Sequence, residues 1–272
     1  MSHPITTPTD ELRAKQQQVW SSGDYNRIAA LTVPVNETVV AAAAVAPGET
    51  VLDIATGTGH SALAAARQGA HATGIDYVPA LLDIARQRAA AERLAVELVE
   101  CPAEELPFDD GSFDVVVSAL GVMFAADHQR AADELVRVVR PGGRIALASW
   151  TAEGFVGGML RTVGRHVSPP PGAQPPVRWG DEGIVAELLG DRVVDLASTV
   201  HSVPARFGTA AAFADHFLAH YGPTHSAANR LDEAGRAALR ADLVELAVEE
   251  GATHAGGVRL DWEYRVVTAT RR

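Results

Sequence analysis

The first half of the chain alternates between short, β-branched apolar runs and longer stretches whose apolar residues recur at helical spacing. The short runs predict strands at Thr50–Ile54, Ala72–Ile75, Val96–Val99, Asp114–Ser118 and Arg144–Ser149. The longer stretches predict helices between them, at His60–Gln68, Val78–Arg93 and His128–Val139. Strands and helices that alternate in this way form βαβ units, which need a parallel sheet with helices on both faces. The pattern therefore predicts an α/β fold with a Rossmann-like sheet.

Further elements are predicted on both sides of this region. Helices are expected at Asp10–Ser22, Val35–Val45, Phe155–Val167, Ile184–Leu189, Ala210–His220 and Asp232–Glu250. Two more strands are expected at Val193–Val203 and Val258–Ala269. We therefore expect a seven-stranded, mostly parallel sheet, with the last two helices forming a lid inserted before the final strand. We expect one domain over residues 1–272, divided into an N-terminal helical cap (1–48), a cofactor-binding core (49–150) and a segment that completes the sheet and walls a substrate pocket (151–272).

Composition and charge narrow the classes of function. The 272 residues include 34 acidic side chains against 23 lysines and arginines, and the resulting charge of −11 repels nucleic-acid phosphates. The longest uncharged apolar stretch, about residues 115–126, is too short to span a bilayer, and the first ten residues contain no apolar signal segment. The single cysteine, Cys101, excludes an intrachain disulfide and a multi-cysteine zinc site. We expect a cytoplasmic monomer or homodimer without nucleic-acid or membrane partners.

The strongest chemical signal is the turn that follows the first predicted strand. Asp53 lies at the end of that strand, and Gly57 and Gly59 follow it in the turn. Glycines let a ligand approach the backbone closely, and the next helix offers free N–H groups. Asp76 ends the following strand, where a carboxylate can accept hydrogen bonds from both hydroxyls of a ribose. Together these residues predict a site for a ligand that contains adenosine.

Asp53 and Ala55 distinguish between candidate ligands. A dinucleotide brings a pyrophosphate to this turn, and Asp53 would repel it. Ala55 also replaces the first glycine of the dinucleotide fingerprint. S-adenosylmethionine carries an ammonium and a sulfonium but no phosphate, so it tolerates Asp53. The residues favour S-adenosylmethionine as cofactor, with an NAD-dependent oxidoreductase as the alternative.

Four motifs in order resemble those of the class I S-adenosylmethionine-dependent methyltransferases. They are Asp53–Gly59, Gly74–Tyr77, Ala103–Phe108 with Gly111–Asp114, and Leu135–Gly143. The Ala-Thr-Gly-Thr-Gly turn is similar to that of the ubiquinone and menaquinone C-methyltransferases, and the likeness spans about Trp20 to Trp150. The remaining tail resembles an actinobacterial group of small-molecule methyltransferases, and this likeness names no substrate.

The resemblance implies roles for individual residues. Around the methionine part of the cofactor it places Tyr25, Asp53, Ala55, Gly57, Gly59 and Ser118. There Tyr25 closes over the carboxylate, Ser118 faces the sulfonium, and Asp53 orients either the turn or the ammonium. Around the adenosine part it places Asp76, Tyr77, Leu81, Ala103 and Glu104, with Asp76 on the ribose. Pro102 stands where the family usually has an aspartate, so adenine recognition has to be rebuilt in part, with Glu104 as a candidate.

The sequence says less about the acceptor pocket and the catalytic residues. Methyl transfer is an in-line displacement in which positioning and desolvation can supply most of the acceleration. Many relatives have a histidine where this chain has Phe124; an apolar wall there suits an aromatic or lipophilic acceptor, although Met123 and Phe124 also fit a core. The expected pocket residues are Trp20, Met123, Phe124 and Trp150. The candidate catalytic residues are His128, His216 and Tyr221. His128 could instead be a solvated residue at the start of a helix, and His216 could instead lie on the surface.

These observations predict an enzyme that transfers a methyl group from S-adenosylmethionine to a small organic acceptor and releases S-adenosylhomocysteine. No metal site is expected, because His216 and His220 share a helix face without an acidic or cysteine partner at ligand spacing. Three alternatives remain at this level: a different reaction on the same cofactor, such as a cyclisation, a non-catalytic binding module, and the NAD-dependent oxidoreductase.

Overall fold

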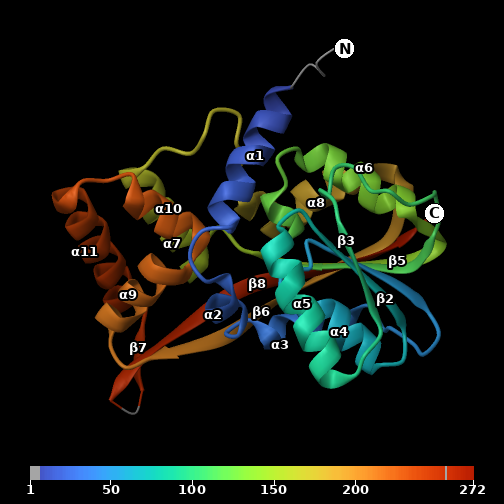
Figure 1. The fold of residues 1–272 in the computed structure, drawn as a ribbon, viewed down its shortest axis with the longest axis horizontal. Helices are drawn as coiled ribbons and strands as arrows, with labels where there is room; N and C mark the ends of the chain where they lie inside the picture. Colours follow the sequence, from blue (N-terminus) through green and yellow to red (C-terminus); the bar gives the residue numbers. More distant parts are fainter. Residues whose placement is uncertain (1–6, 255) are drawn as a thin grey trace.

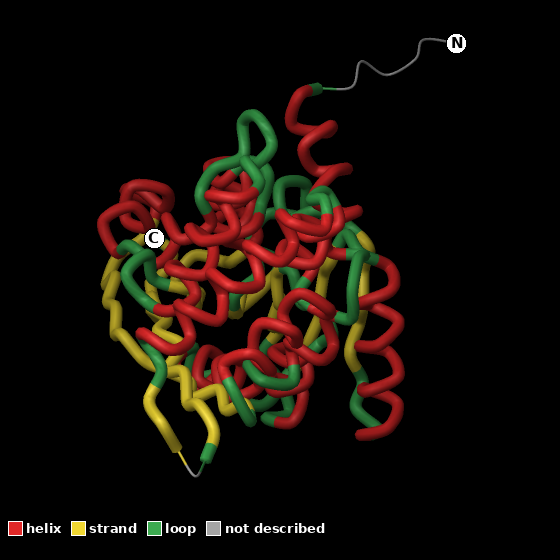
Figure 2. Tube along the Cα trace, turned by 90° about the vertical axis from the view of Figure 1, so that its left-hand side faces the viewer, coloured by secondary structure: helices red, strands yellow, loops and turns green. Residues whose placement is uncertain are grey.

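The structure is a computed structural model that describes residues 7–254 and 256–272. A sheet crosses its centre, with helices packed around it (Figures 1 and 2). The strands are β1 (Thr50–Ile54), β2 (His71–Asp76), β3 (Val96–Glu100), β4 (Phe113–Ala119), β5 (Val139–Trp150), β6 (Val193–Phe207), β7 (Ala252–His254) and β8 (Gly257–Arg271). The start of the predicted N-terminal cap, residues 1–6, lies outside the described residues.

The strand order is β3-β2-β1-β4-β5-β8-β6, and β7 pairs only with β8. The strands β1 to β5 pair in parallel, whereas β8 runs antiparallel to both β5 and β6. The predicted Rossmann-like, mostly parallel sheet is therefore confirmed, and all seven predicted strands are present. The short strand β7 was not predicted, because three residues beside the final strand give too short a pattern to detect.

The helices of three or more turns follow the predicted pattern with small shifts at their ends. They are α1 (Pro8–Trp20), α3 (Val33–Ala42), α5 (Pro79–Glu92), α6 (His128–Val138), α7 (Phe155–His166), α9 (Ala210–His220) and α11 (Glu233–Glu249). The shorter ones are α2 (Tyr25–Ala29), α4 (His60–Arg67), α8 (Glu182–Leu189) and α10 (Gly222–Asn229). Neither α2 nor α10 was predicted: α2 has only five residues, and α10 has eight and opens with Gly-Pro. Proline is in fact tolerated in the first turn of a helix.

The residues Pro141–Gly143, which the predicted elements left between a helix and a strand, lie within β5, because β5 starts before them and continues through them. Gly142 adopts a φ of +73°, and the pairing register between β4 and β5 shifts at this end. The segment is thus an irregular start of the strand rather than a turn that precedes it.

The insertion between β6 and β8 consists of α9, α10 and α11, at the left of Figure 1. These helices pack on one another and on α7. Phe213 and Phe217 of α9 are buried, as are Leu239 and Leu243 of α11, so the insertion has an apolar interior of its own that joins the main core. This packing holds the end of α9 over β8, where it forms one wall of the site.

Candidate active site

The turn after β1 is shaped by positive φ angles. Ala55 and Gly57 both have a φ of +54°, and Gly59 has a φ of +89°. Asp53 is only 1% exposed, and its Oδ2 accepts hydrogen bonds from Thr56 Oγ1 at 2.5 Å and from the Ala62 amide at 3.0 Å. Burial raises the pKa of Asp53 to about 7 against the lowering effect of these hydrogen bonds. Asp53 thus holds the turn itself, which is one of the two roles predicted for it.

Two predicted cofactor contacts lie behind the pocket wall instead of on it. At Gly59 an added Cβ would lie 2.8 Å from the Ala85 Cβ, so this glycine allows α4 to approach α5. The Ser118 hydroxyl donates to the Ile54 carbonyl at 2.7 Å and accepts from the Val122 amide at 3.0 Å. Both residues are corrected to a supporting position, because close packing and local hydrogen bonds occupy their surroundings.

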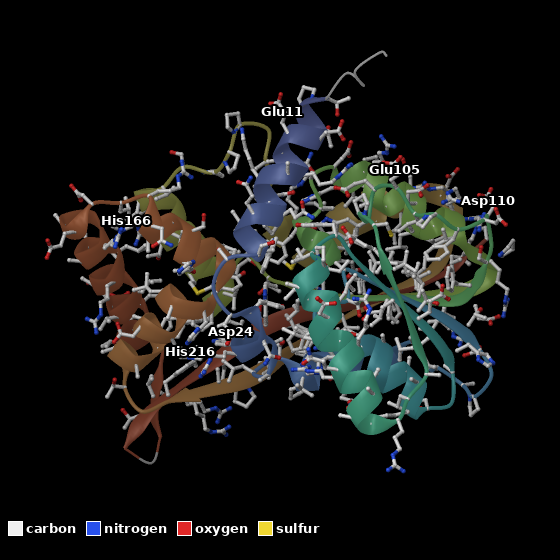
Figure 3. The ribbon with its side chains drawn as sticks, viewed as in Figure 1. Glu11, Asp24, Glu105, Asp110, His166 and His216 are labelled. Carbon is white, nitrogen blue, oxygen red and sulfur yellow. The ribbon has the colours of Figure 1, made fainter. Side chains whose placement is uncertain are left out.

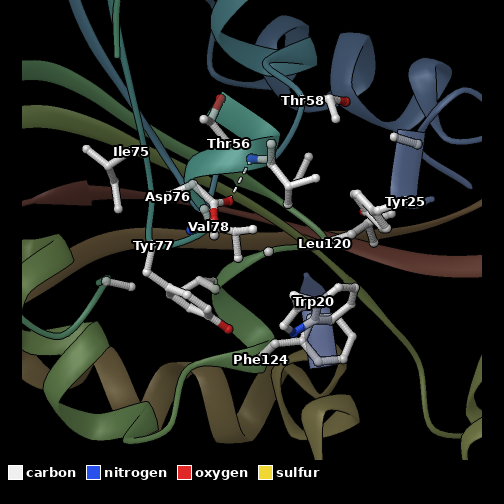
Figure 4. Close-up of a pocket in the computed structure, with 18 of the residues that line it drawn as sticks. Trp20, Tyr25, Thr56, Thr58, Ile75, Asp76, Tyr77, Val78, Leu120 and Phe124 are labelled. Carbon is white, nitrogen blue, oxygen red and sulfur yellow. Dashed lines mark hydrogen bonds between the residues drawn. The ribbon is translucent and has the colours of Figure 1, made fainter. Parts of the chain in front are cut away.

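Asp76 lies at the carboxyl end of β2 and faces the pocket (Figure 4). Its Oδ2 accepts from the Gly57 amide at 2.9 Å, the dashed bond in the figure, and its Oδ1 accepts from the Val78 amide at 2.9 Å. A carboxylate oxygen has a second lone pair, so each oxygen can still accept a hydroxyl. Burial raises the pKa of Asp76 to about 6 against the lowering effect of the backbone amides.

A pocket surrounds the Asp76 carboxylate. Eight residues from the predicted cofactor set line it: Tyr25, Ala55, Gly57, Asp76, Tyr77, Leu81, Ala103 and Glu104. The prediction missed five polar residues that also line it: Thr32, Asn36, Thr56, Thr58 and His60. Thr56 and Thr58 lie inside the predicted turn and could have been read from it, whereas Asn36 comes from a helix that precedes β1. Thr58 Oγ1 is buried and finds no hydrogen-bond partner within the described residues, which leaves it available to a ligand.

Comparison with known proteins agrees with this geometry. Residues 52–147 match the family model of a methyltransferase domain. An uncharacterized protein of Mycobacterium tuberculosis is 43% identical over 98% of this chain and 99% of its own length. A demethylmenaquinone methyltransferase of Clavibacter sepedonicus is 43% identical over 40% of this chain and 44% of its own length. The solved YcgJ protein of Bacillus subtilis shares the fold, with a TM-score of 0.60 and 17% identity over 88% of this chain and 98% of its own.

The chain belongs to the class I S-adenosylmethionine-dependent methyltransferases. It is an enzyme whose cofactor is S-adenosylmethionine, which confirms that prediction and replaces the NAD alternative. The pocket suits this cofactor, since Asp76 can accept hydroxyls and Thr58 offers an unpaired hydroxyl near the glycine turn.

In this methyltransferase Glu104 is engaged with the protein. Its Oε1 accepts from the amides of Ala126 and Asp127 at 2.6 and 3.2 Å, and its Oε2 lies 3.8 Å from Arg13 Nε. Its backbone carbonyl accepts from Arg130 Nε at 2.9 Å. Glu104 thus anchors the start of α6, and its part in adenine recognition stays a prediction.

A second cavity lies beside the cofactor pocket of the methyltransferase. Trp20, Tyr25, Thr32, Leu120 and Phe124 line both cavities. We call the second cavity the aromatic chamber; its seven aromatic lining residues are Trp20, Tyr25, Phe124, Trp150, Phe217, Tyr221 and Trp262. The Trp20 ring meets Phe124 edge to face at 4.8 Å and Tyr221 at 5.7 Å. Trp20, Phe124 and Trp150 thus lie where a substrate pocket was predicted, whereas Met123 is fully buried and belongs to the core.

The three catalytic candidates of the methyltransferase lie in different surroundings. His128 is 1% exposed instead of solvated, lies 5.8 Å from the Trp179 ring, and has a pKa lowered to about 4 by burial. His216 lies near Asp24 (Figure 3) and lines neither cavity; its ring is 4.9 Å from the His220 ring, and burial lowers its pKa. Only Tyr221 lines a cavity, and burial raises its pKa. Among residues 7–254 and 256–272, no group of three or more acidic, histidine or cysteine side chains could hold a metal ion.

Proposed function

We propose that the methyltransferase acts on a small aromatic or lipophilic acceptor that binds in the aromatic chamber. The observation that carries the proposal is that the two cavities lie side by side, because Trp20, Tyr25 and Phe124 line both. An acceptor in the chamber would face the end of the cofactor that lies nearest these rings. Chemistry then needs in-line approach and exclusion of water, both of which an enclosed aromatic wall provides.

The cofactor supplies an electrophilic methyl group, and the residues of the pocket hold and orient it. Asp76 accepts the ribose hydroxyls with the free lone pairs of its carboxylate, and Tyr77 and Leu81 pack against the adenine. The backbone at Gly57 borders the methionine part, and Tyr25 covers it: an added Cβ at Gly57 would lie 3.5 Å from the Tyr25 ring.

The chamber favours positioning over proton transfer. Its titratable side chains within the described residues are the phenols of Tyr25 and Tyr221. Burial raises the pKa of Tyr25 to about 12 and that of Tyr221 further, so both stay neutral at physiological pH. A neutral phenol is a poor base, so acceleration comes from holding the acceptor in line with the methyl group.

Other parts of the proposal concern the whole protein. The charge of −11 supports a small molecule over a nucleic acid as partner. The part of the chain that the structure describes contains no helix long and apolar enough to cross a membrane. One free, buried cysteine fits a reducing cytoplasm, and we propose a single domain that is a monomer or a homodimer.

Calorimetry and turnover test the proposal together. S-adenosylmethionine and S-adenosylhomocysteine are expected to bind with micromolar affinity and NAD not at all. Val156 lines only the chamber, so Val156→Phe is expected to preserve S-adenosylhomocysteine binding while abolishing transfer to a panel of aromatic acceptors. The matched control is Val163→Phe, on the same helix but outside both cavity linings. Equal transfer by Val156→Phe and wild type would place the acceptor elsewhere, and a product formed without release of S-adenosylhomocysteine would favour a cyclisation.

A further inference from the structure

We propose that the acceptor is an uncharged, flat molecule and that the Trp262 indole N–H donates a hydrogen bond to its polar atom. The inference rests on the proposed function and adds the chemical class of the acceptor and the residue that anchors it. Trp262 was not predicted from the sequence as a site residue. It comes from β8, at the side of the chamber formed with α9.

The lining of the chamber carries no formal charge. Its twelve described residues include no aspartate, glutamate, lysine, arginine or histidine. A carboxylate, phosphate or ammonium group buried there would lose its hydration without gaining a partner of opposite charge. The chamber therefore selects against acceptors that carry a permanent charge away from the reacting atom.

Among the polar side-chain groups of the chamber, the Trp262 indole N–H is the one that is both fully buried and without a hydrogen-bond partner in the described residues. Trp262 is 1% exposed, and its Nε1 finds no hydrogen-bond acceptor in the described part of the chain. The surrounding rings offer none, since Phe217 lies 5.6 Å away and Trp150 6.0 Å away, both edge to face. A buried, unpaired N–H destabilises a protein, and a ligand oxygen that accepts from it would recover that free energy.

The aromatic rings also determine which acceptor shape fits the chamber. Trp20, Phe124, Tyr221 and Phe217 form a continuous series of edge-to-face contacts at 4.8 to 5.7 Å. Flat ring systems bind well between aromatic side chains, which offer both faces and edges for contact. A fused bicyclic compound with one hydroxyl or carbonyl oxygen matches the wall and the unpaired N–H together.

The test compares two probes that share a ring system. 1-Naphthol is neutral at pH 7, whereas 1-naphthoate carries a carboxylate on the same rings. Calorimetry on the complex with S-adenosylhomocysteine is expected to give an affinity for 1-naphthol at least ten-fold higher than that for 1-naphthoate. The same titrations with sinefungin, whose ammonium replaces the sulfonium, are expected to keep this order. Equal or tighter binding of 1-naphthoate in both complexes, or no binding of 1-naphthol, would overturn the inference.

Two matched variants test the anchor. Trp262→Phe removes the indole N–H and is expected to weaken 1-naphthol binding about 5- to 150-fold, the range for one lost buried hydrogen bond. Trp179→Phe removes another buried, unpaired indole N–H, outside both cavity linings, and is expected to leave 1-naphthol binding unchanged. Equal weakening by both variants, or none by Trp262→Phe, would contradict the anchor. Both variants should retain S-adenosylhomocysteine affinity, and its absence in the wild type would instead refute the proposed function.

Discussion

Replacing Asp76 with alanine is expected to weaken the binding of S-adenosylhomocysteine. Each Asp76 oxygen already accepts one backbone amide at 2.9 Å, and the remaining lone pairs are the predicted acceptors of the ribose hydroxyls. A buried donor left without its partner costs about 1–3 kcal/mol. Since 1.4 kcal/mol is a factor of ten, this corresponds to about a 5- to 150-fold rise in Kd.

The assay is calorimetric titration of the wild type, Asp76→Ala and a control. Glu100→Ala is the matched control, because Glu100 pairs with Asp76 in the β2–β3 register but points to solvent. The control is expected to bind like the wild type, and thermal unfolding should show that both variants are folded. An unchanged Kd in folded Asp76→Ala would refute the assignment of Asp76 to the ribose.

The pH dependence gives an independent check on the same residue. Burial raises the pKa of Asp76 to about 6, and the ionised carboxylate is the better hydrogen-bond acceptor. The ligand therefore favours ionised Asp76, and affinity should fall as the pH drops from 7 to 5. Asp76→Asn cannot ionise, so its affinity should vary less over this range; the same slope in both proteins would assign the pH dependence to another group.

Further expectations concern the turn that holds the cofactor. The pKa of Asp53 rises from an ordinary 3.8 to about 7 on folding, so the folded state binds the extra proton and wild-type stability should fall as pH rises between these values. Urea unfolding of Asp53→Asn should show a smaller fall, and an equal fall would contradict the buried carboxyl. Gly59→Ala adds a close contact to an unfavourable φ and should lower stability by more than Gly48→Ala, which has a φ of +83° with open space around it. Thermal unfolding measures both, and equal losses would show that α5 adjusts freely.

Local sequence patterns predicted the sheet, because the pattern that identifies each strand or helix is contained within a few residues. Alternation of apolar runs with helical stretches is enough to require βαβ units, and the turn from Asp53 to Gly59 carries its chemistry within seven residues. The same locality explains the errors. The Ser118 side chain points away from the pocket and supports its wall, and neighbouring elements bury His128 against Trp179.

The sequence alone could not predict the aromatic chamber. Its rings come from α1, α2, the turn before α6, β5, the end of α9 and β8, and only the placement of β8 beside β5 brings Trp150 next to Trp262. The sequence predicted Tyr221 as a catalytic candidate, whereas nothing in the sequence distinguished Trp262 from the other apolar residues of the final strand. Long-range strand order and the packing of the insertion therefore determine the acceptor side of the site.

The most direct test of the central claim follows both products of a single reaction. The protein is incubated with S-adenosylmethionine that carries a labelled methyl group and with a panel of uncharged aromatic compounds, and the mixture is analysed by mass spectrometry. We expect the label in one acceptor, one S-adenosylhomocysteine released for each methylated product, and loss of both products in Val156→Phe. Label transfer only to charged acceptors, or undiminished transfer in that variant, would contradict the assignment of the aromatic chamber as the acceptor site.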